Sequence, residues 1–136
     1  MPNRPEYGIK CYSGTSVYHK RFDLPAPPAA GQRLLLDLGE VHEVAAVRLN
    51  GRDMGVLWTK PARVDISGAV TAKDNDLEVT VVNLWPNRLK GDELLPKAAR
   101  FTETNMRKFG AASPLLPSGL IGPVTLRTAD TIPAKK

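Results

Sequence analysis

Proline and glycine interrupt this chain so often that a long helix has little room to form. Twelve prolines and eleven glycines are spread over the 136 residues. Proline lacks a backbone N–H group and glycine loses more conformational entropy than any other residue, so both weaken helices. Short strands joined by turns are favoured instead. The length suits one domain, which at this size buries roughly 68–70% of the surface of its unfolded chain.

Short apolar stretches indicate where the strands lie. They are found at 16–22, 33–38, 44–49, 63–66, 76–83 and 123–128. In the stretch 76–83, Leu77, Val79 and Val81 alternate with polar residues, which is typical of an antiparallel strand with one face in water. We therefore predict an all-β fold, an antiparallel β-sandwich or jelly roll.

The dipeptide Asn50-Gly51 is the clearest local signal. It lies between an apolar stretch and a further short strand through Met54 and Leu57. Both residues of the dipeptide tolerate the positive φ that a type I′ turn requires. The sequence therefore predicts a β-hairpin centred on Asn50-Gly51.

The remaining organisation is that of one unit. We predict a single domain over 1–136, in which 1–15 form a lead-in and 129–136 a frayed tail. The stretch 84–122 is proline-rich and irregular, so we interpret it as a long excursion from the sandwich. One helical turn is expected there, around Lys97–Phe101.

Composition excludes several classes of protein. No stretch approaches the ~20 consecutive apolar residues that cross a bilayer, and no signal peptide begins the sequence, so we predict no membrane partner. The net charge is +5, but basic and acidic residues are mixed, so we predict no nucleic-acid partner. One cysteine and two histidines cannot build an internal disulfide or a zinc site. Cys11 is expected to be a small buried apolar residue.

Two stretches carry a resemblance to a known family. The stretch 47–61 reads VRLNGRDMGVLWTKP, and the stretch 85–92 reads WPNRLKGD. With weaker similarity over 16–128, the chain resembles the galactose-binding-like β-sandwich of family 2 glycoside hydrolases. Within that group it is most similar to the C-terminal sandwich of family 106 α-L-rhamnosidases. The resemblance implies a sugar-binding accessory domain, catalytic carboxylates in another domain, and a periplasmic or extracellular parent protein.

The stretch that begins at Trp85 holds the best candidates for a binding site. It follows the most regular strand, and loops that leave a rigid sheet often bind ligands. Trp85 offers an aromatic face for a sugar ring, and Asn87, Arg88 and Asp92 offer hydrogen bonds for its hydroxyl groups. A structural interpretation is equally open, in which Arg88 pairs with Asp92 and Asn87 caps a turn.

Trp58 is the second aromatic candidate. One interpretation is a platform for a sugar ring, because an indole has a flat apolar face with an N–H group at its edge. The apolar neighbours Val56 and Leu57 favour the alternative, a core tryptophan that closes one end of the sandwich.

Asp74 and Asp76 raise the question of a bound metal. The resemblance leaves a structural calcium ion open, because galactose-binding-like domains often carry one. Calcium needs about six to eight oxygen ligands, and the turn 74–76 supplies only some of them. An Asx-type turn before a strand is the favoured interpretation, so we predict no metal ligands and no cofactor.

Three functions remain for this chain. The leading hypothesis is a non-catalytic module that binds carbohydrate beside a glycoside hydrolase domain. The second is a structural sandwich that packs on a catalytic domain through the apolar stretch 111–121. The third is a small stand-alone glycoside hydrolase, which needs two carboxylates. The candidates are then Asp92, Glu93 and Glu103, the only acids in 84–122.

Overall fold

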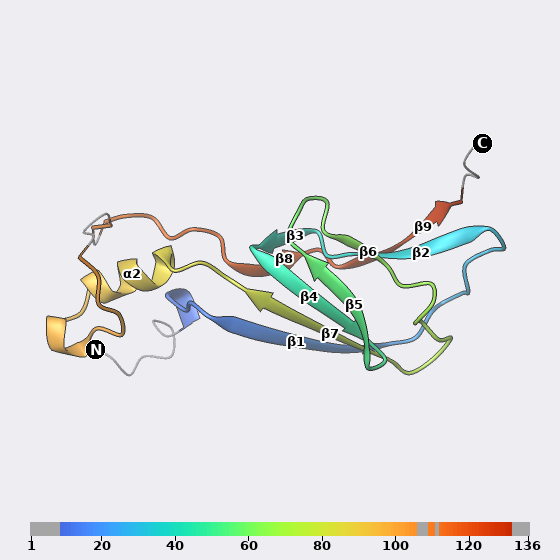
Figure 1. Cartoon of the computed structure of the whole chain (residues 1–136), viewed down its shortest axis with the longest axis horizontal. Helices are drawn as coiled ribbons and strands as arrows, with labels where there is room; N and C mark the ends of the chain where they lie inside the picture. Colours follow the sequence, from blue (N-terminus) through green and yellow to red (C-terminus); the bar gives the residue numbers. More distant parts are fainter. Residues whose placement is uncertain (1–8, 106–108, 111, 132–136) are drawn as a thin grey trace.

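Two antiparallel sheets enclose one apolar core (Figure 1). The computed structural model describes residues 9–105, 109–110 and 112–131. The main sheet has the strand order β1-β7-β4-β5, the second sheet has the order β6-β2-β9, and β3 pairs with β8. The strands are β1 (Thr15–Phe22), β2 (Gln32–Asp37), β3 (Glu40–His42), β4 (Val44–Leu49), β5 (Arg52–Leu57), β6 (Arg63–Asp65), β7 (Asn75–Val82), β8 (Gly119–Gly122) and β9 (Thr125–Asp130). The predicted all-β sandwich is confirmed.

The excursion between β7 and β8 holds the helices. Helix α2 (Pro86–Glu93) and the 3-10 turn η1 (Lys97–Ala99) lie at the opposite end of the molecule from β9 (Figure 1). The expected turn around Lys97–Phe101 corresponds to η1, whereas α2 was not predicted. Neither were β3 and β8, which are too short to show alternation. Within the described ranges, no helix is both long enough and apolar enough to span a membrane.

The alternation of apolar and polar residues along β7 determines which of its side chains enter the core. Leu77, Val79 and Val81 are at most 5% exposed, as the pattern predicts. They belong to one buried cluster with side chains of the other strands, among them Leu36 of β2 and Val47 of β4. Burial of each such aliphatic side chain contributes about 1.5–3 kcal/mol. The core therefore lies between the main sheet and the second sheet.

The turn between β4 and β5 has the predicted conformation. Asn50 and Gly51 have φ values of 52° and 78°. The Asn50 side chain also donates from Nδ2 to the carbonyl of Ala69 and to Oδ1 of Asn75, at 2.8 and 3.0 Å. Its Oδ1 accepts a hydrogen bond from the backbone N–H of Asp76 at 2.8 Å. The hairpin is thus tied to the start of β7.

Two boundary predictions are corrected at the ends of the sandwich. β1 begins at Thr15, inside the predicted lead-in, and β9 continues to Asp130, inside the predicted frayed tail. Asp130 pairs with Gln32 in the ladder, and Gln32 Nε2 donates to Asp130 Oδ1 at 3.1 Å. Cross-strand pairing therefore orders the start of the predicted tail. The predictions for 1–8 and 132–136 lie outside the described residues.

Asp37 connects the three strands of the second sheet. It ends β2 and is 5% exposed. Its Oδ2 accepts from Arg63 Nε of β6 at 2.8 Å and lies 2.9 Å from Arg127 Nε of β9. Its Oδ1 accepts from the backbone N–H of Gly39 at 2.9 Å. The Gly39 N–H group and the Arg63 guanidinium hold the pKa of Asp37 below its ordinary value.

We expect this carboxylate to make the fold sensitive to acid. Because its folded-state pKa is lowered, Asp37 stabilises the fold above its unfolded-state pKa, and this stabilisation is lost as pH falls through the lowered pKa. Urea unfolding from about pH 5 to about pH 2 should show a steeper loss of stability in the wild type than in Asp37→Asn. Equal slopes for the two proteins would contradict the assignment.

Candidate functional site

One end of the main sheet presents three exposed aromatic side chains, and we call this surface the aromatic end. The ladder registers show that β1 and β4 begin at this end, whereas β5 and β7 finish there. Trp58 follows β5 directly, Trp85 comes shortly after β7, and Tyr12 precedes β1. They are 74%, 67% and 42% exposed, respectively. Only β4 separates β5 from β7, which places the two strand ends ~10 Å apart.

The interpretation of Trp58 as a core residue is corrected. Side chains alternate between the two faces of a strand, so Val56 and Trp58 point the same way and Leu57 the opposite way. Leu57 packs against the core, while Val56 is 55% exposed. The inward position at this end of β5 is therefore occupied by Leu57, and Trp58 is left facing solvent.

Asn87 lies inside the excursion and is 4% exposed. Its Nδ2 donates to the carbonyl of Leu116 at 2.8 Å, and its Oδ1 accepts from the backbone N–H of Leu116 at 2.8 Å. Both polar atoms of the Asn87 side-chain amide thus form hydrogen bonds with one residue of the segment 112–118, which leads back to β8. This pair of hydrogen bonds attaches α2 to that segment.

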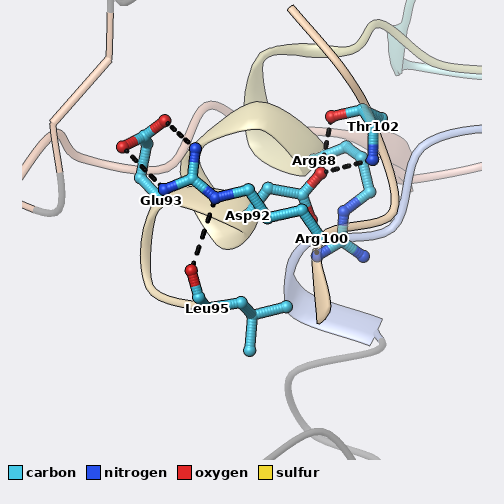
Figure 2. A network of polar contacts seen from close by, with 6 residues as sticks. All are labelled: Arg88, Asp92, Glu93, Leu95, Arg100 and Thr102. Carbon is cyan, nitrogen blue, oxygen red and sulfur yellow. Dashed lines mark hydrogen bonds and ion pairs between the residues drawn. The ribbon is translucent and has the colours of Figure 1, made fainter. Parts of the chain in front are cut away.

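Arg88 and Asp92 form the predicted ion pair inside the same excursion (Figure 2). The Asp92 side chain is 4% exposed, and its Oδ1 lies 3.2 Å from Arg88 Nη2, one helical turn earlier. Asp92 Oδ2 accepts from the backbone N–H and the hydroxyl of Thr102, at 2.9 and 2.5 Å. The Arg88 guanidinium also lies 4.6 Å from the centre of the Phe101 ring. These contacts join α2 to the chain that follows η1.

A second ion pair lies beside the first. Figure 2 shows the Arg100 guanidinium facing the Glu93 carboxylate, with N–O distances of 3.0 and 3.3 Å. Asp92, Glu93 and Glu103 line one cavity of about 620 Å³, so the structure brings the three candidate acids together. Asp92 and Glu93 each already pair with an arginine, whereas Glu103 is exposed.

Helix α2 packs on the chain that precedes β1. Cys11 is 4% exposed, which confirms its expected burial. A Cβ atom at Gly91 would lie only 2.6 Å from Cys11 Cβ, closer than two carbon atoms can approach. The absence of a side chain at Gly91 therefore lets the helix approach this segment.

The turn 74–76 is held by hydrogen bonds of its own. Asp74 has a φ of 55° and its N–H donates to Asp23 Oδ1 at 2.9 Å. Asn75 is fully buried, with its side chain bonded to Asn50 and Thr71. Across the residues that the structure describes, no group of three or more His, Cys, Asp or Glu side chains is placed to hold a metal ion.

A groove beside the aromatic end was missed by the sequence reasoning. Its volume is about 800 Å³, and Tyr12, Tyr18, Asn83 and Ser118 line it. Asn83 Nδ2 donates to Ser118 Oγ at 2.6 Å and to the carbonyl of Tyr12 at 3.0 Å. A smaller hollow of about 210 Å³ shares Asn83 and Ser118 and adds His42. No local signal could have revealed this groove, because it joins segments that are distant in the sequence.

The two antiparallel sheets, with an excursion that holds α2 between β7 and β8, define the chain as a β-sandwich domain. The family described as the glycosyl hydrolase 2 galactose-binding domain-like family matches residues 7–112. The chain belongs to this family. The resemblance carried by the stretches 47–61 and 85–92 is thereby confirmed.

The chain is similar to parts of larger proteins. A rhamnosidase from Novosphingobium sp. PP1Y is 41% identical over 94% of this chain, with a TM-score of 0.83. A Formosa agariphila protein named "Putative beta-glucuronidase" is 38% identical over 88% of this chain. A beta-glucuronidase from Bifidobacterium dentium is 29% identical over 60% of this chain, with a TM-score of 0.50. The chain spans only 12%, 12% and 13% of these proteins, respectively.

Proposed function

We propose that this chain is a non-catalytic carbohydrate-binding module that acts beside the catalytic domain of a glycoside hydrolase. The observation that carries the proposal is the exposure of Trp58 and Trp85, at 74% and 67%, on the same end of the main sheet. Tryptophan is usually much more buried than this. Large exposed aromatic faces are typical of binding surfaces, and a sugar ring offers them a complementary layer of C–H groups.

The five predicted site residues divide into two groups in this proposal. Trp58 and Trp85 contact the sugar rings directly. Asn87, Arg88 and Asp92 turn their polar atoms toward the excursion itself, so they hold α2 and the Trp85 that begins it. A binding surface that is held in place before the ligand arrives loses less entropy on binding.

Replacing Trp85 by alanine should abolish most carbohydrate binding and leave the fold intact. We expect at least a tenfold loss of affinity, which equals about 1.4 kcal/mol, and the same direction of change for Trp58→Ala. The melting temperature should change little, because both side chains are largely exposed. A carbohydrate array identifies the ligand, and calorimetry then compares the variants. The matched control is Leu94→Ala, which removes an exposed apolar side chain at the end of α2.

The same array tests the competing functions if it is run with and without calcium and with an assay for released reducing ends. Binding without release supports the module. Release of sugar would overturn it and direct attention to Asp92, Glu93 and Glu103. If neither binding nor release is detected, the proposed module is also overturned, and a domain that only packs on its enzyme is favoured. Unfolding of Trp85→Ala would place Trp85 in a structural role.

A packing role is the second candidate, and exposed apolar residues support it. Leu115, Leu116 and Ile121, within the predicted stretch 111–121, are 41%, 48% and 55% exposed. Ala111 lies outside the described residues. An isolated domain with such a surface should self-associate as its concentration rises. Sedimentation of a monomer at high concentration would count against this role.

A further inference from the structure

An apolar groove opens between one edge of the main sheet and one edge of the second sheet. Its volume is about 430 Å³. Tyr18 and Phe22 of β1 lie on one side, and Leu126 of β9 lies on the other. Leu36 and Val79, which are 2% exposed, belong to its lining. The buried core of the sandwich is thus reached directly through this groove.

The two strands beside the groove are both edge strands. β1 is the first strand of the main sheet and β9 the last of the second sheet. Each edge strand has one side on which backbone N–H and C=O groups lack a strand partner. Since β1 is eight residues long, it offers a long edge on which an extended peptide can form a ladder.

The register of β1 places a positive charge among the apolar groups. Tyr18 pairs with Val79 and Lys20 pairs with Leu77, so these β1 side chains share the face of the buried β7 residues. Lys20 is exposed and lines the groove. An inward-pointing charge on an edge strand disfavours pairing with a second copy of the same strand, because the two ammonium groups would meet. It favours a partner that brings a carboxylate.

We propose that the groove receives an extended segment of a longer glycoside hydrolase polypeptide, which pairs with β1 as an added strand. Alternate apolar side chains of this segment fill the groove above Leu36 and Val79, and one of its carboxylates lies beside Lys20. The difference in length supports a glycoside hydrolase polypeptide as the source of the segment, since the chain spans only 12% of its rhamnosidase relative. The groove shares only Tyr18 with the groove beside the aromatic end, so sugar binding and strand binding are separable by mutation.

Selection from a library of random decapeptides on the immobilised chain tests the proposal. We expect enriched peptides with apolar residues at every second position and an acidic residue on the same face. Synthetic versions should show nuclear Overhauser contacts with the backbone of β1. Lys20→Glu should weaken the binding of these peptides at least tenfold. Replacement of the peptide carboxylate by an amide should weaken binding to the wild type but not to Lys20→Met.

Two further variants separate the groove from other apolar surfaces. Leu126→Asp should abolish binding, whereas Val56→Asp should not, because Val56 is an exposed apolar residue on β5, the opposite edge of the main sheet. Lys20 is exposed and outside the core, so Lys20→Glu keeps the test valid if Leu126→Asp does not fold. The proposal is overturned if no peptide is enriched, if the peptides lack alternation, or if Lys20→Glu binds them as the wild type does.

Discussion

Replacing Asp92 by alanine is expected to lower the free energy of unfolding by about 3–5 kcal/mol. The substitution leaves the Arg88 guanidinium without its carboxylate partner, and the Arg88 side chain is only 16% exposed. It also removes the acceptor of the Thr102 N–H and hydroxyl groups. A buried charge or donor without a partner loses its hydration and gains nothing in return. Urea unfolding at neutral pH measures the loss.

A double variant separates this cause from a general sensitivity of the excursion. Replacement of both partners by apolar residues, Arg88→Met with Asp92→Leu, should recover the part of the lost stability that comes from the unpaired charge, while the Thr102 N–H and hydroxyl groups still lack their acceptor. Glu103→Ala, which removes an exposed carboxylate from the same cavity, should change stability by less than about 0.5 kcal/mol. The explanation fails if the double variant is as unstable as Asp92→Ala.

The double variant also decides between the two interpretations of Asp92. If Asp92 only positions the excursion, the stable double variant should bind carbohydrate within about threefold of the wild type, less than the tenfold that 1.4 kcal/mol represents. If Arg88 or Asp92 instead forms hydrogen bonds with the ligand, binding should be lost even where stability is recovered. Measuring affinity and stability on the same preparations makes the two outcomes distinguishable.

Replacing Asn75 by alanine is expected to cost about 3 kcal/mol of stability, from at least two buried polar groups that lose their partners. Asn75 is fully buried. Its Oδ1 accepts from the Thr71 N–H at 2.7 Å and from Asn50 Nδ2 at 3.0 Å. Its Nδ2 donates to the carbonyls of Thr71 and Phe22, at 2.7 and 3.2 Å. One amide therefore connects the β4–β5 hairpin, the start of β7 and the end of β1.

Thermal and urea unfolding of Asn75→Ala measure this effect, with the exposed Asn105 as the matched control. Asn105→Ala should change stability by less than about 0.5 kcal/mol. Amide hydrogen exchange should also accelerate first around Asn50 and Thr71, because these groups lose their direct partner. A loss below about 1 kcal/mol for Asn75→Ala would show that water replaces the amide without penalty.

Features that depend on neighbouring residues followed from the sequence. The Asn50-Gly51 turn was predictable because few residues tolerate positive φ at both positions. The burial of Leu77, Val79 and Val81 was predictable because a strand repeats every two residues. The Arg88–Asp92 pair was one of two interpretations open from the sequence, because its two opposite charges lie only four residues apart.

Helix α2 shows where local signals were misjudged. The stretch 84–122 was interpreted as an irregular excursion because it is rich in proline, but proline at the first turn of a helix removes an N–H group that has no partner there. Gly91 is tolerated because it lets the helix approach Cys11. The helix has few apolar residues, so its stability comes from polar contacts such as those of Asn87 and Asp92, which no periodicity reveals.

The sequence by itself determined the family, the longer strands of the sandwich and the central hairpin, because these depend on patterns that are local or periodic. Only the tertiary structure decided that Trp58 faces solvent and that Asn87 bonds to Leu116, 29 residues away. It also placed Asp37 between arginines of β6 and β9. Burial and long-range pairing depend on which elements become neighbours, and this is settled by the packing of the whole core rather than by any one segment.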